Sequence, residues 1–189
     1  MIRVSEFMSE GVCRENDDLK EWWLKRLILL KAIWVAVVVI LHSGLVYADA
    51  RRDAIEACTQ LVIDYAFYRD RPDADGVAEL FSEDATFTLL GTEFKGREAI
   101  RARVAAGVGG PVFRHLISTI NIRPAEGGRE ARGVTYVTVY QGQSETLPQT
   151  LTKPMVIGEY HDRFVQTDAG WKISERVFVP VFLPTTQDG

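Results

Sequence analysis

The sequence has few of the side chains that build metal or nucleotide sites. It contains two cysteines and three histidines in 189 residues. Beyond residue 50 only His115 and His161 remain, and neither has a close His or Cys neighbour. The glycine-rich run 107–110 lacks the spacing of a phosphate-binding loop, and no serine lies in a nucleophile-elbow pattern. We therefore expect no metal and no cofactor, because the ligand count is too low for either class of site.

An excess of basic residues is also absent. The chain beyond residue 50 carries 16 basic and 19 acidic side chains, a net charge of −3. Phosphate binding requires clustered Lys and Arg, so this balance argues against nucleic acid or an anionic membrane as a partner. The 139 residues suffice for one hydrophobic core and are too few for two domains. We find no internal repeat and no low-complexity stretch.

No apolar run is long enough for an ordinary membrane span. Residues 32–41 are uninterrupted and apolar, whereas a span needs about 20 such residues. A basic flank, a short apolar core and the small residues 48–50 are typical of a secretory signal, with cleavage after Ala48 or Ala50. We predict a leader over 1–50 and a folded domain over 51–189. An uncleaved membrane anchor and a buried or non-native extension are the alternatives.

The first part of this leader departs from the signal pattern. Residues 1–26 carry five basic and six acidic side chains, where a short basic segment is expected. A start of translation at Leu24 would yield an ordinary signal, so we question whether residues 1–23 are translated. The leader predicts an exported protein, periplasmic or secreted, or one attached to a membrane only through an uncleaved leader. A cytoplasmic protein is the alternative if the leader is not a functional signal.

The two cysteines lie on opposite sides of the predicted cleavage site. The processed chain would keep only Cys58, which excludes an intramolecular disulfide, although export would permit one. Cys58 falls on the apolar stripe of a predicted helix. We expect it to be a small buried hydrophobic residue.

The domain begins with helices. Apolar residues from Arg52 to Arg69, including Tyr65 and Tyr68, recur every three or four positions and predict an amphipathic helix. Pro72 ends this helix at about residue 70. Asp73 is placed to cap a short helix that runs to Phe81. We then expect a short strand over 85–90 and a helix over 96–106.

Strands follow from residue 112 onward. Alternation and turn signals predict long strands over 112–123, 131–141, 155–166 and 171–181, with a polar loop over 142–153. Helices followed by four long antiparallel strands indicate an α+β domain in which a strongly bent antiparallel sheet wraps the N-terminal helices. Such a sheet, closed at one end by helices, leaves a pocket at the other.

Three residues of this arrangement could carry chemistry. Asp70 ends the first helix, where the macrodipole disfavours a negative charge, and residues that break local rules often lie at functional sites. His115 shares a strand face with Phe113, Ile117 and Thr119. An imidazole oriented by a carboxylate is a common general base near neutral pH. The hydroxyl of Tyr65 could donate a hydrogen bond to a substrate oxygen.

Each candidate has a structural alternative. Asp70 could pair with Arg69 or Arg71, His115 could be a satisfied core histidine, and Tyr65 could be plain core packing. Tyr160 and Asp162 share one face of a later strand. For Asp162, a place in the pocket and a salt bridge at the sheet edge remain equally open.

Four segments together resemble the SnoaL-like branch of the nuclear transport factor 2-like superfamily. They are DYAFYRDRPDADGVAELFSEDATF (64–87), FKGREAI (94–100), FRHLIST (113–119) and GEYHDRFVQTDAGWKISERV (158–177). The resemblance implies a cone-like α+β barrel with an open apolar pocket, commonly a homodimer or homotrimer. The branch includes scytalone dehydratase, a dehydrochlorinase and bile-acid dehydratases.

The resemblance also assigns roles to residues. Asp70 and His115 match the Asp that orients and the His that abstracts a proton, and Tyr65 matches a pocket tyrosine. Thr119 departs from the family, which often has Asn there. We expect Tyr68, Phe113, Ile117, Thr119, Tyr160 and Asp162 to bind the substrate.

The resemblance therefore implies a cofactor-independent lyase or isomerase acting on an apolar, cyclic small molecule through an Asp–His dyad. The alternative is a non-catalytic module of the same fold that binds small molecules or mediates assembly. Contact between Asp70 and His115 inside a pocket favours the enzyme, because the binding module does not require it.

Overall fold

The computed structural model describes residues 9–143, 148, 150 and 153–184. The chain divides into two compact units, Met1–Asp49 and Ala50–Gly189. A helix, α1 (Ser9–Asp70), contributes residues to both units. That the first unit is a leader stays a prediction. That the protein forms a homodimer or homotrimer also stays a prediction.

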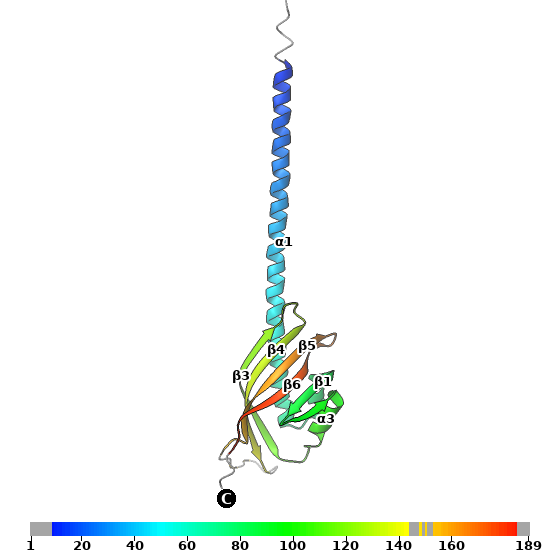
Figure 1. The fold of residues 1–189 in the computed structure, drawn as a ribbon, viewed down its shortest axis with the longest axis vertical. Helices are drawn as coiled ribbons and strands as arrows, with labels where there is room; N and C mark the ends of the chain where they lie inside the picture. Colours follow the sequence, from blue (N-terminus) through cyan, green and yellow to red (C-terminus); the bar gives the residue numbers. More distant parts are fainter. Residues whose placement is uncertain (1–8, 144–147, 149, 151–152, 185–189) are drawn as a thin grey trace, which may run out of the picture. The chain divides into compact units, whose positions relative to one another are not determined.

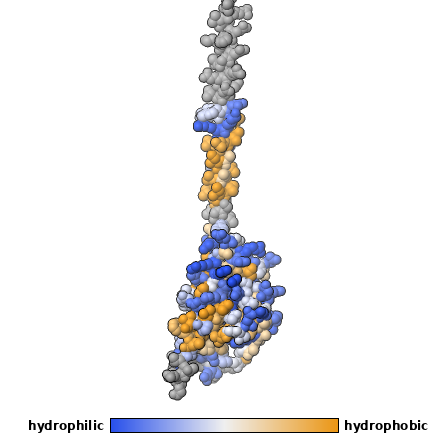
Figure 2. Space-filling model, viewed as in Figure 1, coloured by the Kyte–Doolittle hydropathy of each residue, from blue (hydrophilic) through white to orange (hydrophobic). Residues whose placement is uncertain are grey.

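The N-terminal unit is helical where it is described. Large apolar side chains between Leu27 and Leu41 are exposed along it, and Figure 2 shows them as a continuous apolar band. Within the described part of the chain, no helix combines the length and apolar character that a membrane crossing needs.

The second unit is built on one six-stranded sheet in the order β2-β1-β6-β5-β4-β3. Figure 1 shows the sheet curving beside the end of α1, with α3 near the β1 side. All neighbouring strands pair antiparallel except β1 and β6, which are parallel. The remaining elements are α2 (Ala74–Glu79), β1 (Phe81–Leu89), β2 (Thr92–Lys95), α3 (Arg97–Ala105), β3 (Val112–Pro124), β4 (Glu130–Gly142), β5 (Val156–Thr167) and β6 (Gly170–Phe182).

This architecture confirms the predicted α+β class and the four long antiparallel strands. The first helix ends at Asp70 as expected, and the Asp73 side chain caps α2 by accepting a hydrogen bond from the Gly76 N–H at 2.8 Å. Most of the predicted polar loop over 142–153 lies outside the described residues. The strong local signals of periodicity, proline and capping therefore place these elements correctly.

The region after α2 differs from the prediction. The helix ends at Glu79, and β1 starts at Phe81 rather than at residue 85. The Ile173 N–H donates a hydrogen bond to the Leu80 carbonyl at 2.8 Å, so the distant strand β6 draws Phe81 into the sheet. Leu90 and Gly91, both with positive φ, then form a two-residue turn into β2, which the sequence did not reveal.

A bulge in β3 corrects the predicted face of this strand. Ile117 lies opposite Val137, whereas Ile120 lies opposite Thr135, so β3 holds one extra residue between them. An extra residue reverses the side to which later side chains point. Thr119 is consequently exposed instead of sharing the inner face with His115, and Ile122 is buried in its place.

The core lies between α1 and the inner face of the sheet. Cys58 and Val62 of α1 are fully buried there, together with Phe164 of β5 and Ile173 of β6. The free thiol of Cys58 is thus a buried small hydrophobic group, as expected. Burial, reinforced by the negative charge of Asp162, raises the pKa of the Cys58 thiol to about 12.

This pKa predicts a loss of stability at alkaline pH. The unfolded thiol ionises near pH 9 whereas the folded one stays neutral to about 12. The stabilisation is therefore complete below pH 9 and is lost as pH rises, by up to about 1.4 kcal/mol per unit. Two proteins test this in urea titrations, one with Cys13→Ser alone and one with Cys13→Ser and Cys58→Ala. Their free energies of unfolding should converge between pH 9 and 10.5, because only the protein that keeps Cys58 loses the stabilisation of the neutral thiol. A constant difference would contradict this.

Candidate active site

The end of α1 places a carboxylate against β3, an edge strand of the sheet. Asp70 is the last residue of the helix, and the N–H groups of Arg71 and Asp73 donate hydrogen bonds to the Tyr68 carbonyl in the turn that follows. The Asp70 side chain therefore leaves the helix at a fixed point and reaches β3. Its two oxygens accept the backbone N–H of His115 at 3.2 and 3.1 Å.

The same carboxylate contacts the imidazole of His115. The distance from Asp70 Oδ1 to His115 Nδ1 is 2.6 Å, and the two side chains are only 10% and 7% exposed. With the carboxylate ionised, Nδ1–H donates and Nε2 is left as an acceptor. Neither Arg69 nor Arg71 pairs with Asp70 within the described chain. Asp70 is thus held by three contacts to a single residue, in the geometry of a base and its orienting group.

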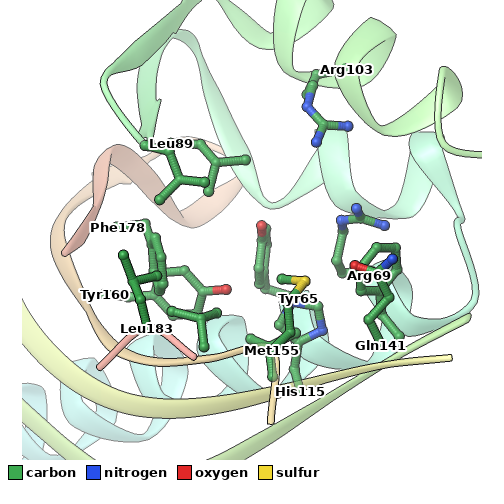
Figure 3. A pocket seen from close by; sticks show the side chains of 14 residues that line it. Tyr65, Arg69, Leu89, Arg103, His115, Gln141, Met155, Tyr160, Phe178 and Leu183 are labelled. Atoms are coloured by element: carbon green, nitrogen blue, oxygen red, sulfur yellow. The ribbon is translucent and has the colours of Figure 1, made fainter. Parts of the chain in front are cut away.

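His115 lines a cavity of about 340 Å³, which lies in the size range of small-molecule sites. Residues from α1, the β1–β2 turn, α3 and strands β3 to β6 surround it, and Figure 3 shows them from close by. Its lining is mostly apolar and comprises Tyr65, Arg69, Leu89, Leu90, Arg103, Phe113, His115, Val139, Gln141, Met155, Val156, Tyr160, Phe178 and Leu183.

Two tyrosine hydroxyls point into this cavity. Figure 3 shows Tyr65 and Tyr160 directing their oxygens toward its centre. The Tyr65 ring packs edge-on against His115 and Tyr160, with centroid separations of 6.4 and 5.5 Å. Burial, with further contributions from Tyr65 and Asp162 against the opposing charge of Arg176, raises the pKa of Tyr160 well above its usual value. The Tyr160 hydroxyl therefore stays protonated and can donate a hydrogen bond to a ligand.

A buried ion pair supports both tyrosines from behind. Arg176 Nε and Nη2 donate to the two oxygens of Asp162, each at 2.7 Å, and both side chains are fully buried. The guanidinium lies over the rings of Tyr65 at 4.2 Å and Tyr160 at 4.4 Å. Burial disfavours its charge, but attraction to Asp162 prevails and raises the pKa of Arg176. The pair thus fixes the two rings that face the ligand.

The prediction for Asp162 is corrected by this pair. Asp162 does not line the cavity, and it does not form a salt bridge at the sheet edge. Its carboxylate lies in the core because β5 is a central strand whose inner face alternates through Tyr160, Asp162 and Phe164. Asp162 thus acts on the site from behind its wall, through its hydrogen bonds to Arg176 and through its charge near Tyr160.

Of the remaining residues predicted to bind the substrate, some line the cavity and others do not. Phe113 and Tyr160 line the cavity. Tyr68 and Ile117 pack against the core outside the lining, and Thr119 is exposed behind the bulge. Phe113 lines the cavity because it lies on the same face of β3 as His115. Thr119 lies within the bulge and does not share that face.

Sequence reasoning missed several lining residues. Arg69, Arg103 and Gln141 add polar groups to the cavity, and Leu90 lines it with a φ of 50°, a value that non-glycine residues rarely adopt. The position of Gln141 at the end of an alternating strand was the only available signal. Arg69 and Arg103 looked like ordinary surface charges on two helices.

The described residues contain no group of three or more His, Cys, Asp or Glu side chains that could hold a metal ion. The side chains at the site offer one imidazole oriented by a carboxylate, two hydroxyl donors, and guanidinium groups at its margin.

Comparison with known proteins identifies the family of the domain. The family model described as a SnoaL-like domain matches residues 50–177. No curated protein is similar enough to match the chain.

Solved structures share the fold. A Mycobacterium tuberculosis protein of unknown function is 26% identical, with 68% of this chain and 72% of that one covered, at a TM-score of 0.60. A Novosphingobium aromaticivorans protein provisionally assigned as a scytalone dehydratase is 20% identical, with coverages of 75% and 99% and a TM-score of 0.61. A nuclear transport factor 2-like protein with a cystatin-like fold from the same organism is 22% identical, with coverages of 67% and 80% and a TM-score of 0.55. The last two likenesses concern the fold alone.

Proposed function

The chain belongs to the SnoaL-like domain family, and from this premise we propose that it is a cofactor-independent lyase or isomerase. Its substrate is an apolar, cyclic small molecule, and its base is His115 oriented by Asp70. The 2.6 Å contact between these side chains, at the wall of a mainly apolar cavity, is the observation that carries the proposal.

Each side chain has a defined part in the reaction. His115 Nε2 removes a proton from a carbon next to an activating carbonyl or enone, while the Nδ1–H remains hydrogen-bonded to Asp70 and the carboxylate stabilises the imidazolium. The Tyr65 hydroxyl donates to the substrate oxygen on which negative charge develops. In a lyase the electron pair then forms a carbon–carbon double bond as the neighbouring C–O bond breaks, and the departing hydroxide takes the proton from the His115 imidazolium and leaves as water. In an isomerase the proton returns to a different carbon.

The cavity wall favours such a reaction. Because its lining is mainly apolar, it keeps water away from the anionic intermediate and strengthens each hydrogen bond to it. The buried Arg176–Asp162 pair holds Tyr65 and Tyr160 in place, so the hydroxyls need no reorganisation during the reaction. A module that only binds ligands has no need for the Asp70–His115 contact.

A screen of cyclic hydrophobic alcohols and enones tests the proposal. Loss of water or migration of a double bond, followed by mass spectrometry and ultraviolet absorbance, should identify a converted compound. His115→Ala should then lower kcat by about 10²–10⁴-fold, the usual worth of a positioned general base. The matched control is His161→Ala, because His161 is half exposed and pairs with Glu159 away from the cavity.

Full turnover by the His115→Ala variant would exclude this mechanism. Binding of panel compounds without conversion would instead favour the non-catalytic binding module.

A further inference from the structure

The cavity carries positive charge that no described residue neutralises with an ion pair. Arg69 and Arg103 line it, and no aspartate or glutamate is among its lining residues in the described chain. Other arginines of the domain have carboxylate partners, such as Arg101 with Asp75 at 2.6 Å. Among the described residues, Arg69 and Arg103 form no ion pair. Two unpaired guanidinium groups in an apolar cavity are costly unless a ligand supplies the opposite charge.

Arg69 has a buried N–H group, at Nη1, without a hydrogen-bond partner among the described residues. The guanidinium packs over the Phe113 ring at 4.9 Å, which orients it but satisfies none of its N–H groups. Buried polar atoms in folded proteins nearly always have a partner, and an unpaired one calls for an explanation. An oxyanion of a bound molecule would provide that partner.

The polar and apolar parts of the lining lie on different sides. Figure 3 shows Arg69, Arg103 and Gln141 together on one side of the cavity, whereas Leu89, Phe178 and Leu183 gather on the other. The hydroxyls of Tyr65 and Tyr160 lie between these groups. A ligand that fits this distribution has an anionic end, an apolar body and a reactive part near the tyrosines and His115.

We propose that Arg69 and Arg103 bind the carboxylate of the substrate, which makes the substrate class apolar carboxylic acids. A guanidinium offers paired N–H donors that match the two oxygens of a carboxylate. The inference rests on the proposed function, because it assigns the substrate class of the same cavity. Anchoring one end would also fix which carbon faces His115.

Binding of matched probes to the full chain tests this assignment. Isothermal titration calorimetry would compare 2-naphthoate with the neutral amide of the same shape, 2-naphthamide, and cinnamate with cinnamamide. We expect each acid to bind at least tenfold more tightly than its amide. Arg69→Gln and Arg103→Gln should each reduce the preference severalfold, and the double variant should abolish it, because charged hydrogen bonds of this kind are worth about tenfold or more.

The controls use neighbouring residues. Arg101→Gln removes the same charge from α3, but from the exposed pair with Asp75, and should keep the preference. His115→Ala should also keep the preference, so a failure of the catalytic proposal alone would appear as turnover retained in this variant with the acid preference intact. Equal affinity of acid and amide, no binding of any probe, or a preference that survives in a folded double variant would overturn the assignment.

Discussion

Asp70→Asn is expected to lower kcat by about 10³-fold or more while leaving the fold intact. The amide oxygen can still accept the backbone N–H of His115, which Asp70 accepts at 3.1–3.2 Å. The amide nitrogen, however, would donate to Nδ1 and force the ring proton onto Nε2. His115 would then lack the lone pair that takes the proton from the substrate.

The measurement separates a positioning role from a structural one. Steady-state kinetics on the compound identified by the screen should show a lower kcat, while probe affinity and melting temperature stay near those of the unchanged protein. Asp64→Asn is the matched control, since it makes the same change on α1 at an exposed pair, where the carboxylate accepts a hydrogen bond from Gln60 at 2.8 Å. A kcat within tenfold of normal for folded Asp70→Asn would remove Asp70 from the mechanism.

Asp162→Ala is expected to reduce the free energy of unfolding by about 3–5 kcal/mol, the usual cost of leaving one member of a buried ion pair alone. Arg176 would remain fully buried without its two 2.7 Å hydrogen bonds. Its Nη1 atom already lacks a partner in the described chain, so no alternative acceptor is at hand. Urea denaturation followed by circular dichroism measures the change.

Two further variants calibrate this result. Glu175→Gln breaks the neighbouring surface pair between Glu175, which is 38% exposed, and Arg163, which is 59% exposed. It should lower the free energy of unfolding by no more than about 1 kcal/mol. The double variant Asp162→Leu, Arg176→Met removes both charges and should be more stable than Asp162→Ala, because apolar replacement of a whole buried pair is often neutral. Equal losses for Asp162→Ala and Glu175→Gln would show that the buried pair contributes little.

Local signals explain which parts of the fold were predictable. Alternation and turn residues located the bounds of β3 and β6 to within one or two residues. A strand with one buried face places an apolar residue at every second position, and this pattern is visible in the sequence. The four residues of β2 are too short for such a pattern. The pairing of β1 with β6 leaves no local trace, because it depends on residues far apart in the chain.

The candidate site was predictable where it followed a regular element and hidden where a sheet irregularity intervened. The end of α1 and the start of β3 placed Asp70 and His115 correctly. A hairpin without irregularities would pair Asp162 of β5 with Glu175 of β6. In the structure β6 holds one extra residue, Ser174, because Phe164 pairs with Ile173 whereas Arg163 pairs with Glu175. Asp162 therefore faces Arg176. An insertion of this kind is decided by packing across the sheet, which a single sequence does not record.

The parallel pairing of β1 with β6 also has a consequence for biosynthesis. Lys172 donates a hydrogen bond to the Glu79 carbonyl across 93 residues of chain. Contacts of such high sequence separation form slowly, because a long loop must close before they contribute. The helices and β1 leave the ribosome first, with their apolar faces uncovered until the last strand arrives. The cavity, whose wall includes Phe178 of β6, is therefore a late product of folding, and a nascent chain that stalls before β6 cannot hide its core from chaperones and proteases.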